Sequence, residues 1–184
     1  MKRSRLLIVG LLTLILSAIV VIVAARRENA RPTLRSTSTT HEQAVAQFFA
    51  GNLPDVDGQT RPFSAWQGQT LVINFWATWC PPCRDEMPAF SRLHQLYAAQ
   101  GVQFVGIALD AADRVRAYAR QYPVSYPLLI GGSTGVDLAR LFGNDRLGLP
   151  YTVLITRQRE ARVLRAGPLS ENELNLILQE TLKR

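Results

Sequence analysis

The sequence is poor in the side chains that most often bind transition metals. Its 184 residues include two cysteines, two histidines and two methionines. A structural zinc site needs about four Cys or His ligands, and His41 and His94 do not form a closely spaced pair. A purely structural disulfide between Cys80 and Cys83 would close too short a loop to restrict the unfolded chain much. We therefore expect no metal site and no structural role for the cysteine pair.

Excess positive charge is almost absent beyond the first 35 residues. The formal net charge is +7, and residues 1–35 carry seven basic side chains against one acidic side chain. The remaining 149 residues carry 14 basic and 13 acidic side chains. A nucleic-acid-binding domain would concentrate positive charge on its folded part. The charge distribution therefore argues against nucleic acid as a partner.

Residues 6–25 form a run of twenty residues without a charged side chain. A helix of that length spans a hydrocarbon core of about 30 Å. The alternative is a cleavable signal peptide, because residues 23–25 (VAA) resemble a cleavage site, but the apolar core of a signal is usually about 7–15 residues. We expect an uncleaved anchor that exports the rest of the chain, although Arg26 and Arg27 leave its orientation nearly undecided by flanking charge.

The chain is predicted to divide into four parts. Residues 1–5 are expected to form a cytoplasmic N-terminus and residues 6–25 a transmembrane anchor. Residues 26–45 are polar and contain little to bury, which is typical of a flexible linker. Residues 46–184 are predicted to form one folded domain.

Within that domain, apolar strand patterns alternate with helical ones. The last two predicted strands are so close together in the chain that only a hairpin can join them. A C-terminal helix is predicted to follow, because Ser170 and Glu173 have the spacing of a capping box. Alternating strands and helices predict an α/β fold with a mixed central sheet flanked by helices. The predicted strands are residues 70–77, 102–110, 126–131, 151–156 and 161–167, and the predicted helices are residues 81–100, 111–122 and 134–143.

The cysteine pair falls where a predicted strand gives way to a helix. Unpaired N–H groups and the helix dipole favour an anion there, and a thiolate so placed can have a pKa well below about 8.5. Pro81 suits the first helical position because it has no N–H to leave unpaired. Cys83 lies about one turn after Cys80, so one sulfur can attack a substrate and the other can resolve the adduct. The pattern predicts a redox-active disulfide, with no other cofactor.

The segment FWATWCPPCRDEMPAF (residues 75–90) resembles the active site of the thioredoxin superfamily. It is most similar to the membrane-anchored, extracytoplasmic branch of TlpA/ResA type. LPDVDGQ (residues 53–59) and GLPYTVLI (residues 148–155) extend the resemblance over about residues 53–184. The resemblance implies a thioredoxin-like fold.

The resemblance also implies a role for individual residues. Cys80 matches the nucleophile and Cys83 the resolving thiol, while Pro88 matches a proline that kinks the active-site helix. Pro150 matches a cis-proline that faces the dithiol, and a cis bond is an uncommon structural feature. The residues implied in substrate binding are Trp79, Pro81, Pro82, Leu149, Pro150 and Tyr151.

Two further positions are expected to modify the chemistry. Ordinary thioredoxins bury a titratable aspartate at the position of Asn74. Proteins of the TlpA/ResA type commonly lack that aspartate, as this chain does. Glu86 matches a glutamate near the dithiol in ResA-type proteins, and we hypothesise that it supplies the missing acid and base function. The alternative is that Glu86, like Asp85, only complements the positive end of the helix dipole.

The predicted function is thiol–disulfide exchange by an enzyme. The resemblance implies a reductase for disulfides of exported proteins, for example in cytochrome c maturation, recharged by a membrane electron donor of the thiol-transporting type. It places a single-pass protein in the bacterial inner membrane, in contact with lipid through residues 6–25, with its catalytic domain in the periplasm. The alternative is a copper(I) carrier that uses the same thiolates. A peroxidase is less favoured, because no further cysteine precedes the pair.

Overall fold

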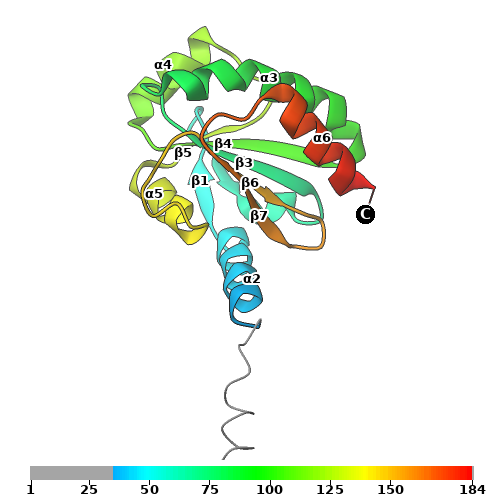
Figure 1. The fold of residues 1–184 in the computed structure, drawn as a ribbon. Helices are drawn as coiled ribbons and strands as arrows, with labels where there is room; N and C mark the ends of the chain where they lie inside the picture. Colours follow the sequence, from blue (N-terminus) through cyan, green and yellow to red (C-terminus); the bar gives the residue numbers. More distant parts are fainter. Residues whose placement is uncertain (1–34, 184) are drawn as a thin grey trace, which may run out of the picture. The chain divides into compact units, whose positions relative to one another are not determined.

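The computed structural model describes residues 35–183 of the chain (Figure 1). Residues from Ser38 onward form one compact unit. In this part of the chain, no helix is both long and apolar enough to cross a membrane. The anchor predicted at residues 6–25 lies outside the described residues.

The centre of the fold is a mixed five-stranded sheet. Its strands lie in the order β5-β4-β3-β6-β7, where β3 pairs in parallel with β4 and β4 with β5, while β6 is antiparallel to both β3 and β7. The mixed sheet and the late hairpin predicted from the sequence are thereby confirmed. The strands are β3 (Thr70–Trp76), β4 (Val102–Ala108), β5 (Leu128–Ile130), β6 (Tyr151–Ile155) and β7 (Ala161–Ala166).

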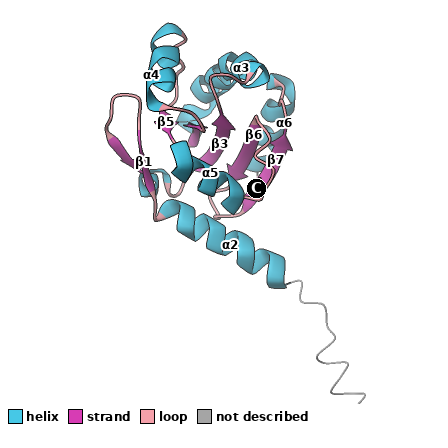
Figure 2. Ribbon diagram, turned by 90° about the vertical axis from the view of Figure 1, so that its left-hand side faces the viewer, coloured by secondary structure: helices cyan, strands magenta, loops and turns pink. Residues whose placement is uncertain are grey.

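Helices cover both faces of this sheet, as Figures 1 and 2 show. Every residue of β3 is buried, and successive side chains point to opposite faces. Leu71, Ile73 and Phe75 pack with α2 and α5, whereas Val72 and Trp76 pack with α3, α4 and α6. The helices are α2 (Arg35–Phe49), α3 (Pro81–Tyr97), α4 (Ala112–Gln121), α5 (Gly132–Leu141) and α6 (Glu171–Leu182).

The folded part begins earlier than the sequence indicates. The predicted boundary between linker and domain, at residues 45 and 46, falls inside α2, and Ala44 and Val45 are buried. The physical reason is helical spacing, which places these two side chains on the same face as Phe48 and Phe49. Phe48 also stacks on Phe63 with ring centroids 4.4 Å apart.

A short antiparallel hairpin follows α2 and was not predicted as strands. It consists of β1 (Asn52–Pro54) and β2 (Thr60–Pro62), and a 3-10 turn at Phe63–Trp66 comes next. These strands have three residues each, which is too short to give a clear alternation of apolar and polar residues. Buried Phe63 and Trp66 then attach the segment to the core shared with α2 and α5.

The capping box predicted for the last helix is confirmed. Ser170 Oγ accepts a hydrogen bond from Glu173 N at 3.3 Å, and Glu173 Oε2 accepts one from Ser170 N at 3.1 Å. The reciprocal bonds satisfy two N–H groups that the start of a helix otherwise leaves unpaired. They also fix the backbone beside Leu169, which belongs to the candidate site.

Candidate active site

The two cysteines lie where β3 passes into α3. Cys80 is the N-cap residue of α3, and its Sγ accepts a hydrogen bond from Cys83 N at 3.3 Å. The two sulfur atoms are joined in a disulfide, with the Cα atoms 5.3 Å apart. Pro81 and Pro82 occupy the first helical positions, where a missing N–H leaves no bond unmade. The strand-to-helix placement predicted from the sequence is confirmed.

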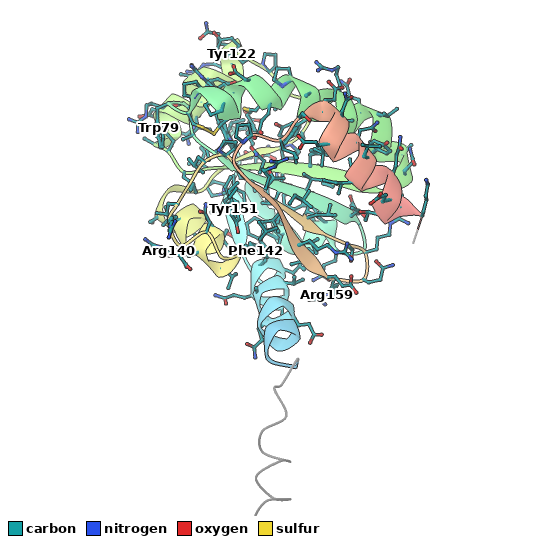
Figure 3. The ribbon with its side chains drawn as sticks, viewed as in Figure 1. Trp79, Tyr122, Arg140, Phe142, Tyr151 and Arg159 are labelled. Carbon is teal, nitrogen blue, oxygen red and sulfur yellow. A yellow bond between two sulfur atoms is a disulfide. The ribbon has the colours of Figure 1, made fainter. Side chains whose placement is uncertain are left out.

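The two sulfur-bearing residues differ in their access to solvent. Cys83 is fully buried, whereas Cys80 is 4% exposed. Trp79 precedes Cys80 and projects outward with 63% of its surface exposed (Figure 3). Of the two cysteines, only Cys80 has any exposed surface, so an incoming disulfide or thiol is expected to attack Cys80. This asymmetry fits the roles expected for them, with Cys80 attacking and Cys83 resolving.

The loop before β6 contains the cis peptide bond that the family resemblance implies, between Leu149 and Pro150. Leu149 packs against the cluster of buried residues that includes both cysteines. Pro150 O accepts a hydrogen bond from Gly167 N at 2.8 Å, which ties this loop to the end of β7. The cis-proline loop therefore belongs to the surroundings of the dithiol.

Tyr151 differs from its expected role as a substrate-binding side chain. Its side chain is buried and packs beside Phe75, with ring centroids 6.3 Å apart. Its hydroxyl donates a hydrogen bond of 2.8 Å to Phe142 O (Figure 3). The side chain thus joins β6 to the end of α5. The physical reason is that Tyr151 is the first residue of an inner strand, whose side chains are all buried.

Glu86 is a buried carboxyl group one turn after Cys83. Its Oε1 accepts a hydrogen bond from Asn74 Nδ2 at 2.7 Å, and its Oε2 accepts one from Leu169 N at 3.1 Å. Burial raises the pKa of Glu86 to about 7, while the hydrogen bonds from Leu169 and Asn74 act in the opposite direction. The group therefore changes charge near neutral pH, which is the range a general acid or base requires.

Asn74 connects this carboxyl group to the sheet. Besides Glu86, its Nδ2 donates to Thr152 Oγ1 at 3.3 Å on the neighbouring strand β6. Its Oδ1 is buried and has no hydrogen-bond partner within residues 35–183. Asn74 stands on the same face of β3 as Val72 and Trp76, the face that packs against α3. The sequence placed Asn74 near the dithiol, but it did not show the direct bond to Glu86.

A hollow in the surface leads to Glu86. It has a volume of about 410 Å³ and is lined by Pro82, Asp85, Glu86, Ala89 and Leu169 among others. A hollow of this size is large enough for several water molecules. Glu86 can therefore exchange a proton with solvent from the side of α6, although only 6% of the residue is exposed.

Pro88 lies inside α3 as the sequence shows. There it has no N–H to donate to the carbonyl group of Arg84.

Asp110 follows β4 and accepts hydrogen bonds from the loop that leads to Cys80. Sequence reasoning missed Asp110, although an aspartate at the end of an apolar strand was a signal that could have found it.

Residues 35–183 contain no cluster of three or more His, Cys, Asp and Glu side chains arranged to hold a metal ion. His94 Nδ1 lies 2.9 Å from Ser125 Oγ, in contact with the loop before β5.

A thioredoxin-like α/β fold with a Cys-x-x-Cys disulfide at the mouth of a helix defines a thiol–disulfide oxidoreductase, and comparisons with known proteins agree. Residues 44–163 match the model of the AhpC/TSA family. The chain is 30% identical to the thiol-disulfide oxidoreductase ResA of Halalkalibacterium halodurans over 74% of each chain. It is 36% identical to the thioredoxin-like protein YneN of Bacillus subtilis, over 67% of this chain and 71% of that one.

Solved structures show the same relationship. A thiol:disulfide interchange protein of the thioredoxin family from Chlorobium tepidum is similar with a TM-score of 0.63 and 28% identity, covering 72% of this chain and 92% of that one. A thioredoxin-related protein from Neisseria meningitidis serogroup B has a TM-score of 0.63 and 30% identity, covering 72% and 99%. The chain belongs to the AhpC/TSA family, within which it is of the TlpA/ResA type, and it is an enzyme of thiol–disulfide exchange.

Proposed function

We propose that this enzyme reduces disulfides of exported proteins, for example apocytochrome c, in the bacterial periplasm. The observation that carries the proposal is the Cys80–Cys83 disulfide at the N-terminus of α3, in which Cys80 is 4% exposed and Cys83 is fully buried. Similarity to the ResA oxidoreductases supports it. The uncharged run at residues 6–25 has the length of a membrane anchor, so we assign the protein a single pass through the inner membrane, in contact with its lipid.

The proposed reaction passes through one mixed disulfide. The Cys80 thiolate attacks one sulfur of the substrate disulfide, and the other substrate sulfur leaves as a thiolate that takes up a proton. The Cys83 thiol then loses its proton, and its sulfur attacks Cys80 and displaces the second substrate thiolate. The substrate gains two electrons and two protons, and the enzyme ends with the Cys80–Cys83 disulfide present in this structure.

Glu86 is proposed to accept the proton that Cys83 loses in the second step. Cys83 is fully buried, and burial without compensation disfavours a thiolate. Glu86 lies one turn further along α3, and its pKa is raised to about 7 by burial. The hollow beside α6 gives it a route by which to return the proton to water.

Replacing Glu86 with glutamine is expected to change the pH dependence of Cys83 alkylation in the reduced enzyme. The wild type should show an inflection near pH 7 that reports the ionisation of Glu86, and the Glu86→Gln variant should lack it, because glutamine does not titrate. The measurement is the rate of iodoacetamide modification between pH 5 and pH 9, with the modified cysteine identified by mass spectrometry.

Asp85→Asn is the matched control for this experiment. Asp85 is an exposed carboxylate on the same turn of α3, so its removal changes the charge near the helix N-terminus without touching Asn74 or Leu169. If the pH profile of Cys83 alkylation changed equally in both variants, Glu86 would act only by its charge near the positive end of the helix dipole. An unchanged profile in Glu86→Gln would remove it from the mechanism.

A reductase in an oxidising compartment needs a supply of electrons, because thiols exposed there become disulfides. We propose that a membrane protein of the thiol-transporting type attacks the Cys80–Cys83 disulfide and restores the dithiol. The donor would use the same accessible sulfur as the substrate, since Cys83 is covered. This step makes the enzyme a carrier of electrons from the membrane to exported proteins.

The reduction potential tests the proposed direction of electron flow. It can be measured by equilibration with dithiothreitol or glutathione, next to an insulin or apocytochrome c reduction assay. A potential near about −270 mV, like that of thioredoxin, supports a reductase, and one near about −120 mV indicates a protein that oxidises thiols to disulfides instead. Tight copper(I) binding without insulin reduction would favour the alternative function of a copper carrier.

A further inference from the structure

A buried carboxylate from the neighbouring strand holds the loop that carries Cys80. Asp110 follows β4 by two residues, and its side chain is fully buried. One of its oxygens, Oδ2, accepts a hydrogen bond from Thr78 N at 3.1 Å and another from the Thr78 hydroxyl. Thr78 is thus held by both its backbone and its side chain, two residues before Cys80.

Asp110 is itself rigidly held. Its other oxygen, Oδ1, accepts hydrogen bonds from Ala111 N and from Arg114 Nε, each at 2.7 Å, and Arg114 also forms an ion pair with it. Burial alone would raise the pKa of Asp110, but the hydrogen bonds from Arg114, Thr78 and Ala111 hold it below its usual value. The carboxylate is therefore ionised at neutral pH, and the hydrogen bonds that it accepts are of the stronger, charge-assisted kind.

The bonds to Asp110 act together with two backbone hydrogen bonds of the short loop between β3 and α3. Only residues 77–80 separate the end of β3 from the first residue of α3. Trp76 O accepts a hydrogen bond from Leu109 N at 2.8 Å, and Ala77 O accepts one from Cys80 N at 3.1 Å. Asp110 and Thr78 supply the fixed point in the middle of this short path, and Cys80 caps the helix at its end.

We propose that Asp110 is a positioning residue for Cys80, acting through Thr78, for the exchange reaction proposed above. The two bonds to Thr78 keep the Cys80 sulfur aligned with Cys83 N and with the positive end of α3. Those groups stabilise a thiolate only when the sulfur lies close to them. A loosened loop would leave Cys80 present but less often in the aligned position.

Valine and asparagine substitutions test this proposal. Thr78→Val removes the hydroxyl at nearly constant shape, and Asp110→Asn removes the negative charge that strengthens both bonds. In each variant the Cys80 thiol should have a higher pKa, and its reaction with oxidised glutathione at pH 7 should slow by about tenfold, as expected for the loss of one charge-assisted hydrogen bond. Thr78→Ser, which keeps the hydroxyl, should restore most of the rate.

Asp113→Asn is the matched control, because it removes a fully exposed carboxylate from the same helix as Arg114. It should leave both the pKa of Cys80 and the rate unchanged. The double variant with Thr78→Val and Asp110→Asn should lose much less than the product of the two single losses, because both changes break the same contact.

The outcomes separate this inference from the proposed function. An unchanged Cys80 pKa and rate in a folded Thr78→Val variant would overturn the positioning role, even if Asp110→Asn fails to fold. A double variant whose loss of rate equals the product of the two single losses would overturn the positioning role as well. Failure of the wild type to reduce insulin would instead count against the proposed function, because the glutathione reaction needs no protein substrate.

Discussion

Replacing Cys80 with serine is expected to reduce insulin disulfide reduction by at least about a thousandfold, the scale on which enzymes lose activity when a nucleophile is removed. Cys80 is the accessible member of the pair and stands at the N-cap of α3. A serine hydroxyl does not ionise near neutral pH, so the helix N-terminus has no anion to stabilise there. The measurement is insulin turbidity with dithiothreitol as the source of electrons, in wild type and variant.

The Cys83→Ser variant is the matched partner of this experiment. It keeps the attacking sulfur and removes the resolving one, so the mixed disulfide with the substrate should accumulate and be visible on non-reducing gels and by mass spectrometry. Turnover should be lost in both variants, but only Cys83→Ser should trap the substrate. A trapped complex in Cys80→Ser would reverse the two assignments.

Between pH 4 and pH 8, the free energy of unfolding of the oxidised wild type is expected to fall by about 3 kcal/mol more than that of the oxidised Glu86→Gln variant. Glu86 has a pKa of about 7 in the folded state against 4.5 for an unperturbed group, because burial disfavours its charged form. The folded state therefore binds more protons than the unfolded state between these values. Its stability falls with rising pH through that window, and the loss is complete above pH 7.

Urea unfolding at several pH values measures this difference. Glutamine also changes the hydrogen bonds to Asn74 and Leu169. That contribution does not depend on pH, so it cancels when the stability of one variant at one pH is subtracted from its stability at another. Asp85→Asn is again the control, because it removes an exposed carboxylate from the same turn of α3 and leaves Glu86 and its hydrogen bonds in place. Parallel curves for wild type and Glu86→Gln would show that Glu86 titrates normally in the folded protein.

The sequence allowed the central architecture to be predicted because its signals are local and strong. The buried run at residues 70–77 became β3 at Thr70–Trp76, and the helix expected at residues 81–100 became α3 with a final 3-10 turn. The capping box at Ser170 was also found as expected. These features depend on the residues next to them along the chain, which a sequence displays directly. The cis bond at Pro150 was expected from the family resemblance instead, and it is present as well.

The contacts that tune the site could not be predicted in the same way. Glu86 meets Leu169 N from a loop more than eighty residues away in the chain, and Thr78 meets Asp110 across two neighbouring strands. No periodicity encodes such pairs, because they exist only once the sheet has set which strand ends lie together. The burial of Tyr151 was missed for a related reason, since β6 becomes an inner strand only when β3 and β7 pair with it on either side.

The covered position of Cys83 has a consequence for kinetics. The electron donor and the substrate protein must both form their mixed disulfide with the sulfur of Cys80, so they compete for it and react one after the other. The enzyme should then follow a ping-pong scheme, and an excess of either reactant should inhibit use of the other. Because only one sulfur is accessible, the reaction with the electron donor must be complete before the reaction with the substrate can begin.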